Sequence, residues 1–112
     1  MNKLKQMRKD KKAKDKVWAL LVKTRDNNCC VICNSNLKPN AHHLIPRENH
    51  LLRWEVDNGV TLCPKHHRFS FELSAHQNPL AFFIWLKRNK REQLNKLLTK
   101  YFGEEYGEGK DN

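Results

Sequence analysis

Short strand-like segments in the middle of the chain and helical segments at both ends predict a small α+β domain. The strand-like segments cover residues 41–45 and residues 54–62, where β-branched side chains flank an Asp57-Asn58-Gly59 turn signal. Cysteine and histidine side chains with the spacing of metal ligands enclose this middle part. We therefore expect a thin mixed core that a metal ion stabilises and that helices flank on both sides.

The N-terminal part combines a basic arm with a helix. Residues 1–16 alternate Lys or Arg with polar residues, which fits either a solvated, partly disordered arm or a helix that forms on a phosphate backbone. From about Asp15, apolar residues can cover one broad face of a helix that ends near Asn27 and Asn28. These residues are Val17, Trp18, Leu20, Leu21 and Val22. We assign this face to the core.

Helix signals return after the strand-like segments. Pro64 fits the first turn of a helix, so Cys63 should stand at the start of a helix over residues 65–73. Asn78 and Pro79 repeat this pattern with an N-cap and a proline at the first helical position.

The last part of the domain is expected to be helical. Apolar residues recur at three- and four-residue spacing over residues 82–101, which predicts one long helix or two short ones. Gly103 should end the last helix, and residues 103–112 should form a flexible acidic tail. The expected organisation is thus an arm over residues 1–16, a domain over residues 17–102, and this tail.

The charge of the chain restricts its partners. The 112 residues include 22 Lys and Arg against 12 Asp and Glu, a formal charge of +10, and most of the excess falls in residues 1–16 and 87–100. A nucleic acid fits such a charge better than a membrane, because no segment has the apolar face of an anchor or the length of a spanning helix. No secretion signal is visible either, so we expect a cytoplasmic protein whose cysteines bind metal rather than form disulfides.

Two pairs of residues carry metal-ligand spacing. Cys30 and Cys33 are separated by two residues, which lets both sulfurs face one ion, and Cys63 with His66 repeats this spacing. Four such ligands in two pairs fit tetrahedral zinc, and a closed set of this kind is structural because no position stays open for a substrate. The alternative is that these four side chains only pack in the core.

Three further histidines accompany these pairs. On a strand, His42 and His43 point to opposite faces, so they cannot share one simple role. On a helix, His66 and His67 point about 100° apart, so one can complete the zinc site while the other faces a second site. Each histidine alone is more often a surface imidazole, but the set predicts a catalytic site. Two loop histidines stay unassigned, His50 and His76.

The order of these residues resembles the HNH nucleases. It runs from Cys30-x-x-Cys33 to His43, then to Asn58 in the string Asn58-Gly59-Val60-Thr61-Leu62-Cys63, then to His67 directly after the second pair. The resemblance covers residues 18–71, roughly half of the chain. It implies a ββα-metal (His-Me finger) core, in which a β-hairpin and a helix surround one catalytic divalent ion and the zinc pairs pin the hairpin to its neighbours.

The resemblance also implies an activity and a role for each residue. The implied enzyme is a metal-dependent DNA endonuclease that hydrolyses phosphodiester bonds. His43 would be the general base that activates water, His42 and His67 would hold the catalytic cation, and Asn58 would fix the loop that orients the base. The cofactors would be a structural Zn²⁺ and a catalytic cation such as Mg²⁺, Mn²⁺ or Ni²⁺. Hydrolysis of a phosphodiester does need a base of near-neutral pKa and a cation.

Two positions differ from the common pattern of the family. His42 stands where many members have Asp, a variation that resembles the His-His pair of nuclease colicins. His66 replaces the more usual fourth cysteine, and an imidazole is a good zinc ligand.

Two other functions fit parts of the sequence. A zinc-stabilised DNA-binding module without catalysis would use the basic ends, and a protein-interaction zinc knuckle would need only the zinc pairs. The combination of His42, His43, Asn58 and His67 favours the nuclease, because a pure binding module has no reason to contain it. Cleavage of both DNA strands by one site would require a dimer, a partner protein or two successive events.

Overall fold

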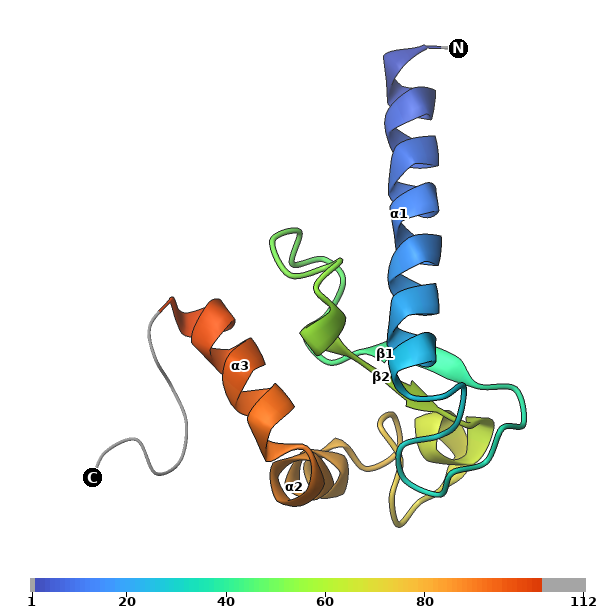
Figure 1. The fold of residues 1–112 in the computed structure, drawn as a ribbon, viewed down its shortest axis with the longest axis vertical. Helices are drawn as coiled ribbons and strands as arrows, with labels where there is room; N and C mark the ends of the chain where they lie inside the picture. The colour runs from blue at the N-terminus through green and yellow to red at the C-terminus, as the bar shows by residue number, and fades with distance from the viewer. Residues whose placement is uncertain (1, 104–112) are drawn as a thin grey trace.

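The computed structural model describes residues 2–103 and has the α+β class that the sequence predicts. A two-stranded antiparallel sheet lies next to the base of a long N-terminal helix, and two shorter helices form the C-terminal part (Figure 1). This arrangement is compatible with a small ββα fold. Within residues 2–103, no helix is long and apolar enough to span a membrane.

Helix α1 (Lys3–Arg25) begins far earlier than the expected start near Asp15. The side chain of Asn2 caps it by accepting a hydrogen bond from the backbone N–H of Lys5 at 2.9 Å. Lysine, arginine, glutamine and alanine favour helix, so the basic segment continues the helix although its side chains are exposed up to Lys14. Residue 16, the expected boundary between arm and domain, lies inside this helix.

The expected broad core face of α1 was wrong. Only Trp18 and Val22, which lie one turn apart, are buried. The other apolar residues of this segment are largely exposed, namely Val17 at 57%, Leu20 at 62% and Leu21 at 49%. The contact is narrow because α1 packs directly on the backbone of Gly59, where an added β-carbon would lie 2.5 Å from Trp18 Cζ2 and 2.8 Å from Val22 Cγ2.

The sheet pairs β1 (Asn40–His43) with β2 (Gly59–Leu62), with His42 opposite Val60 and His43 opposite Gly59. Both strands are shorter than expected. The segment before Gly59 forms a single helical turn, η1 (Val56–Asn58), instead of a strand.

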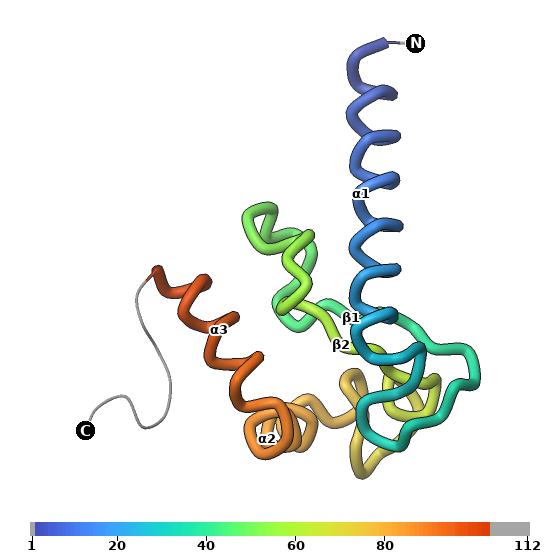
Figure 2. Tube along the Cα trace, viewed as in Figure 1, coloured from blue at the N-terminus to red at the C-terminus, as the bar shows by residue number. Residues whose placement is uncertain are grey.

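The loop of residues 44–55 leaves β1 and returns to η1 close to α1 (Figure 2). Helices from both ends of the chain hold it. Asp15 of α1 forms an ion pair with Arg53, and Lys100 near the C-terminus forms one with Glu55. The loop has no regular structure, so these contacts restrict its position.

A wide helical turn, η2 (Lys65–Phe69), follows Pro64 and replaces the longer helix expected over residues 65–73. The turn ends at Ser70, whose backbone is extended (φ −74°, ψ 124°) and whose N–H forms the last hydrogen bond of the turn, to the carbonyl of Lys65 at 2.8 Å. The chain then folds back along η2. Backbone hydrogen bonds of 2.9 Å from Ala75 to His66 and 3.1 Å from His76 to His67 fix this return.

Two short helices complete the domain. The sequence predicts either one long helix or two short ones here, and the structure has two. Helix α2 (Pro79–Asn89) begins at the Asn78 cap, which accepts from the N–H of Ala81 at 3.1 Å. Helix α3 (Arg91–Phe102) ends at Gly103, whose φ of 77° is the left-handed conformation of a helix C-cap. The expected tail, apart from Gly103, lies outside the described residues.

The core lies between the sheet and these helices. Leu62 and Val60 of β2 are fully buried, with 0% exposure each, and they pack with Cys30 and Cys63 and with α2 and α3. Its buried members are Cys30, Val60, Leu62, Cys63, Phe82, Leu86 and Leu94. Two of the four predicted zinc ligands, Cys30 and Cys63, thus belong to the core, whereas Cys33 is exposed.

Candidate functional site

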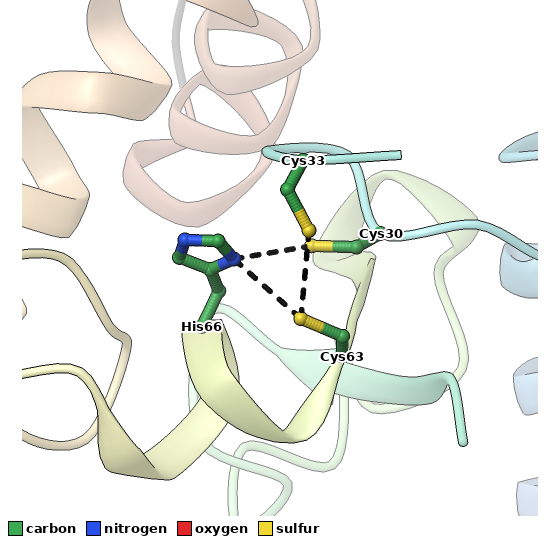
Figure 3. Close-up of side chains that lie close together, drawn as sticks. All are labelled: Cys30, Cys33, Cys63 and His66. Atoms are coloured by element: carbon green, nitrogen blue, oxygen red, sulfur yellow. Dashed lines mark hydrogen bonds between the residues drawn. The ribbon is translucent and has the colours of Figure 1, made fainter. Parts of the chain in front are cut away.

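The four side chains predicted as zinc ligands come together (Figure 3). The Sγ atoms of Cys33 and Cys63 lie 3.7 Å apart. His66 Nδ1 lies 3.5 Å from the Sγ of Cys63 and 3.7 Å from that of Cys30. Cys30 and Cys33 come from the turn after α1, and Cys63 and His66 from the start of η2, so the group joins two segments that are distant in the sequence.

These distances fit a tetrahedral zinc ion. With sulfur at about 2.3 Å and nitrogen at about 2.0 to 2.1 Å from zinc, two sulfurs lie about 3.8 Å apart and sulfur lies about 3.5 Å from nitrogen. The observed separations of 3.7, 3.5 and 3.7 Å match this geometry. The group could therefore hold a zinc ion.

The surroundings of Cys63 and His66 favour the metal-binding forms of these two ligands, whereas burial raises the pKa of the Cys33 thiol. Burial raises the pKa of the Cys63 thiol, but hydrogen bonds, first among them that from the backbone N–H of His66, lower it overall. Burial, assisted by the charge of Lys65, lowers the pKa of His66 and keeps its imidazole neutral at pH 7. Thiolate and neutral imidazole are the forms that coordinate zinc.

A second group consists of His42, His67 and His76, each of which offers one ring nitrogen that lies within 4.8 Å of those of the other two. The Nε2 atoms of His67 and His76 are 3.2 Å apart. The ring of His42 stands edge-on to both, with centroids at 5.1 Å from His67 and 5.4 Å from His76. These three nitrogens could hold one metal ion, and three protein ligands leave coordination positions for water or substrate.

Two histidines of this group, His42 and His67, are neutral at physiological pH. Burial, together with repulsion from His67 and His76, lowers the pKa of His42 to about 3. Burial and the neighbouring His76 and Arg68 lower the pKa of His67 to about 4. Both rings thus offer lone pairs at pH 7 without having to lose protons.

Local backbone geometry explains how the three rings meet. Strand β1 directs His42 to the face that Phe82 of α2 also contacts, at a centroid distance of 5.8 Å. In η2, His66 turns to the cysteines while His67 turns to His42, as their angular separation predicts. His76 arrives through the returning chain, which the hydrogen bond between its N–H and the carbonyl of His67 holds.

Sequence reasoning missed His76. It left this residue as an unassigned loop histidine, because its distance from His67 along the chain matches no common ligand spacing. The only local signal is the Ser74 hydroxyl, which caps the short turn before His76 by accepting from the N–H of Gln77 at 3.0 Å. His50, the other unassigned histidine, is exposed in the loop of residues 44–55 and outside both groups.

His43 lies on the opposite face of β1, as strand alternation predicts. Its ring stacks on Trp18 with a centroid distance of 3.7 Å and an interplanar angle of 7°. Its Nε2 lies 2.9 Å from the carbonyl oxygen of Arg53. A carbonyl only accepts, so Nε2 carries the proton and donates, which leaves Nδ1 with the lone pair. Burial lowers the pKa of His43, so the ring is a neutral base at pH 7.

Asn58 is the last residue of η1, just after the loop of residues 44–55, and its side chain is fully buried. Its Oδ1 accepts from the N–H of Ile45 at 2.7 Å, and its Nδ2 donates to the carbonyls of Ile45 at 3.0 Å and Leu52 at 3.1 Å. One side chain thus joins both ends of the segment that lies between His43 and Arg53. These contacts fix the loop that follows His43.

No family model matches the chain, and neither a curated protein nor a solved structure matches it.

Proposed function

We propose that the protein is a metal-dependent DNA endonuclease of the HNH type, which hydrolyses phosphodiester bonds. One observation supports this proposal above the others. Neighbouring residues of one strand, His42 and His43, join a three-histidine metal group on one face to a neutral imidazole with a free Nδ1 on the other. A DNA-binding module or a protein-interaction knuckle needs neither feature.

The three histidines fit a catalytic cation, with His76 as a third ligand beside the expected His42 and His67. Nitrogen ligands at such positions lie about 3.0 to 3.4 Å apart around one ion, and the His67–His76 separation is 3.2 Å. Imidazole ligands suit Ni²⁺ and Zn²⁺ better than Mg²⁺, so the set favours Ni²⁺ or Zn²⁺ over Mg²⁺. When bound, the cation would neutralise charge on the phosphate and on the departing oxygen.

His43 would act as the general base. Its Nδ1 would take a proton from the water that attacks phosphorus, while the bond from phosphorus to the leaving sugar oxygen breaks. The hydrogen bond from Nε2 to the Arg53 carbonyl would keep the ring in the tautomer that this step needs, and it would stabilise the imidazolium that forms.

Both faces of β1 can serve one phosphate because the strand has a free edge. Within residues 2–103 the sheet contains only β1 and β2, so β1 pairs on one side alone. A phosphate at the free edge would lie between the cation group on one face and His43 on the other.

The four-ligand group would support this site without taking part in the chemistry. A zinc ion there would join the turn after α1 to the start of η2. His66 would then be fixed by the metal, and His67, the next residue, would be directed to the second group.

Helix α1 supplies the charge for binding DNA. Its exposed first turns carry eight basic residues that can contact phosphates without reading bases. They are Lys3, Lys5, Arg8, Lys9, Lys11, Lys12, Lys14 and Lys16. In Figure 1 this part of the helix projects away from the rest of the molecule, where a duplex can reach it.

Cleavage of supercoiled plasmid tests the proposal. The purified protein should convert the plasmid to nicked or linear form with added Mn²⁺ or Ni²⁺, and chelation of that cation should stop the reaction. Binding of DNA without conversion under any of the tested cations would contradict the nuclease and favour the non-catalytic zinc-stabilised binding module.

A further inference from the structure

Two residues of α1 that lie one turn apart surround His43. Trp18 contacts the His43 ring, and Asp15 contacts Arg53, the residue to which His43 is hydrogen-bonded. Trp18, which is 3% exposed, covers one face of the imidazole in the parallel stack. Its own ring is fixed at the far end, because Nε1 donates to the carbonyl of Glu55 at 2.7 Å. The plane of the His43 ring is thus set by a side chain that cannot itself rotate freely.

Asp15 affects the same imidazole indirectly, because it binds the side chain of Arg53. Its carboxylate accepts from Arg53 Nε at 2.9 Å and Nη2 at 2.7 Å, and from Trp54 Nε1 at 2.9 Å. The carbonyl of Arg53 is the acceptor for His43 Nε2. These hydrogen bonds, with that of Arg53 the strongest cause, lower the pKa of Asp15 and keep it ionised at neutral pH.

These contacts matter because the loop of residues 44–55 has no regular structure of its own. Asn58 joins its two ends, but it makes no bond to Arg53. A two-point bond from Arg53 to a helix restricts the direction of the Arg53 carbonyl far more than a single contact would.

We propose that Asp15 and Trp18 are positioning residues for His43, which hold its ring with Nε2 as donor and Nδ1 as acceptor. This inference rests on the proposed function, in which His43 is the general base. Because both residues belong to α1, the helix with the exposed basic turns would also set the geometry of the base.

Single substitutions give the kinetic test. Asp15→Asn removes the charge that holds Arg53, and Trp18→Leu removes the stacked ring. Each should lower kcat roughly 10- to 100-fold with little change in KM, since a small misplacement of a reacting group has effects of this size. Trp18→Phe, which keeps an aromatic face, should recover much of the loss of Trp18→Leu.

Two controls separate positioning from loss of stability. Val22→Ala truncates another buried residue of α1, and Lys100→Met breaks another ion pair between a helix and the same loop. Both should retain kcat at a temperature where all variants are folded. If these controls lose as much kcat as Asp15→Asn and Trp18→Leu, the inference is overturned.

A double-mutant cycle identifies the residue through which Asp15 and Trp18 act. In a His43→Ala background, Asp15→Asn and Trp18→Leu should cause no further loss, because the group that they position is gone. A further loss of the same factor as in the wild-type background would show that they act elsewhere and would overturn the inference.

Nuclear magnetic resonance of the imidazoles gives a readout that needs no cleavage. In the zinc-loaded protein, His43 should show the Nε2–H tautomer and ring protons shifted upfield by the indole of Trp18. Asp15→Asn should mix the tautomers, and Trp18→Phe should reduce the upfield shift. If the wild-type protein cuts no DNA, the proposed function fails, yet this measurement still decides the inference. An unchanged tautomer in Asp15→Asn, or no upfield shift in the wild type, would overturn it.

Discussion

The Nε2 atoms of His67 and His76 lie 3.2 Å apart, a hydrogen-bond distance between two rings that belong to different segments. Two protonated imidazoles would repel each other at this separation. The pair is therefore suited either to share one proton or to bind one cation together, and the nearby ring of His42 favours the cation.

His76→Ala should weaken the cation of the second group. Loss of one of three nitrogen ligands lowers affinity, and water can fill the vacated position, so cleavage should return in part at high Mn²⁺ or Ni²⁺ concentration. Calorimetric titration of zinc-loaded protein with Mn²⁺ or Ni²⁺ measures the affinity. His50→Ala, a control in the exposed loop, should leave it unchanged. Equal affinities of wild type and His76→Ala would remove His76 from the ligand set.

The purified protein should contain one tightly bound zinc ion. Native mass spectrometry of the folded monomer should show the added mass of the zinc ion. Cys33→Ser should lose the ion and much of the thermal stability, because metal binding contributes to folding free energy. Cys29→Ser is the matched control, since Cys29 adjoins Cys30 but lies outside the ligand group. A folded, metal-free wild-type protein would contradict this prediction, as would unchanged stability of Cys33→Ser.

The exposed turns of α1 should add affinity for DNA that does not depend on sequence. Each phosphate contact contributes about 0.9 to the slope of log affinity against log salt for a duplex. Deletion of residues 1–12 should flatten this slope in a salt titration of binding. The deletion stops before Asp15, so it keeps the contact with Arg53 and should leave the fold intact. An identical slope in the shortened protein would show that these turns do not contact DNA.

The stability of the protein without a cation in the second group should fall as the pH is lowered. The pKa of His42 is about 3 in the folded state against an ordinary value of 6.5, so between these values the unfolded chain binds a proton that the folded chain does not. This single group can contribute at most about 1.4 kcal/mol per pH unit to the loss. Urea unfolding at two pH values between 6.5 and about 5 should show a shallower dependence in His42→Asn. Parallel pH dependences would contradict the low pKa of His42.

The two pairs of the predicted zinc group could be recognised in the sequence because the geometry within each pair is local. The spacing of Cys30 with Cys33, and of Cys63 with His66, brings both members of a pair to one ion whatever the rest of the fold. The opposite directions of His42 and His43 also follow from strand alternation alone. These features needed no knowledge of tertiary contacts.

The remaining part of the site depends on contacts between distant segments, which spacing does not encode. His76 reaches His67 only because the chain after η2 folds back and forms backbone hydrogen bonds. The link from Asp15 to Arg53 joins residues 38 positions apart. The sequence left the early start of α1 open for a different reason, since alternating basic and polar residues fit both a helix and a solvated arm.

The two adjacent histidines of β1 give the most direct test of the proposed mechanism. Plasmid cleavage by His43→Ala and His42→Ala should be compared over a titration of Mn²⁺ or Ni²⁺. We expect His43→Ala to bind zinc and DNA normally but to lose a factor of roughly 100 to 10,000 in rate at every cation concentration, as for a missing general base. His42→Ala should regain activity as the cation increases. Near-wild-type cleavage by His43→Ala would contradict its role as the base, and rescue of His43→Ala but not of His42→Ala would reverse the two roles.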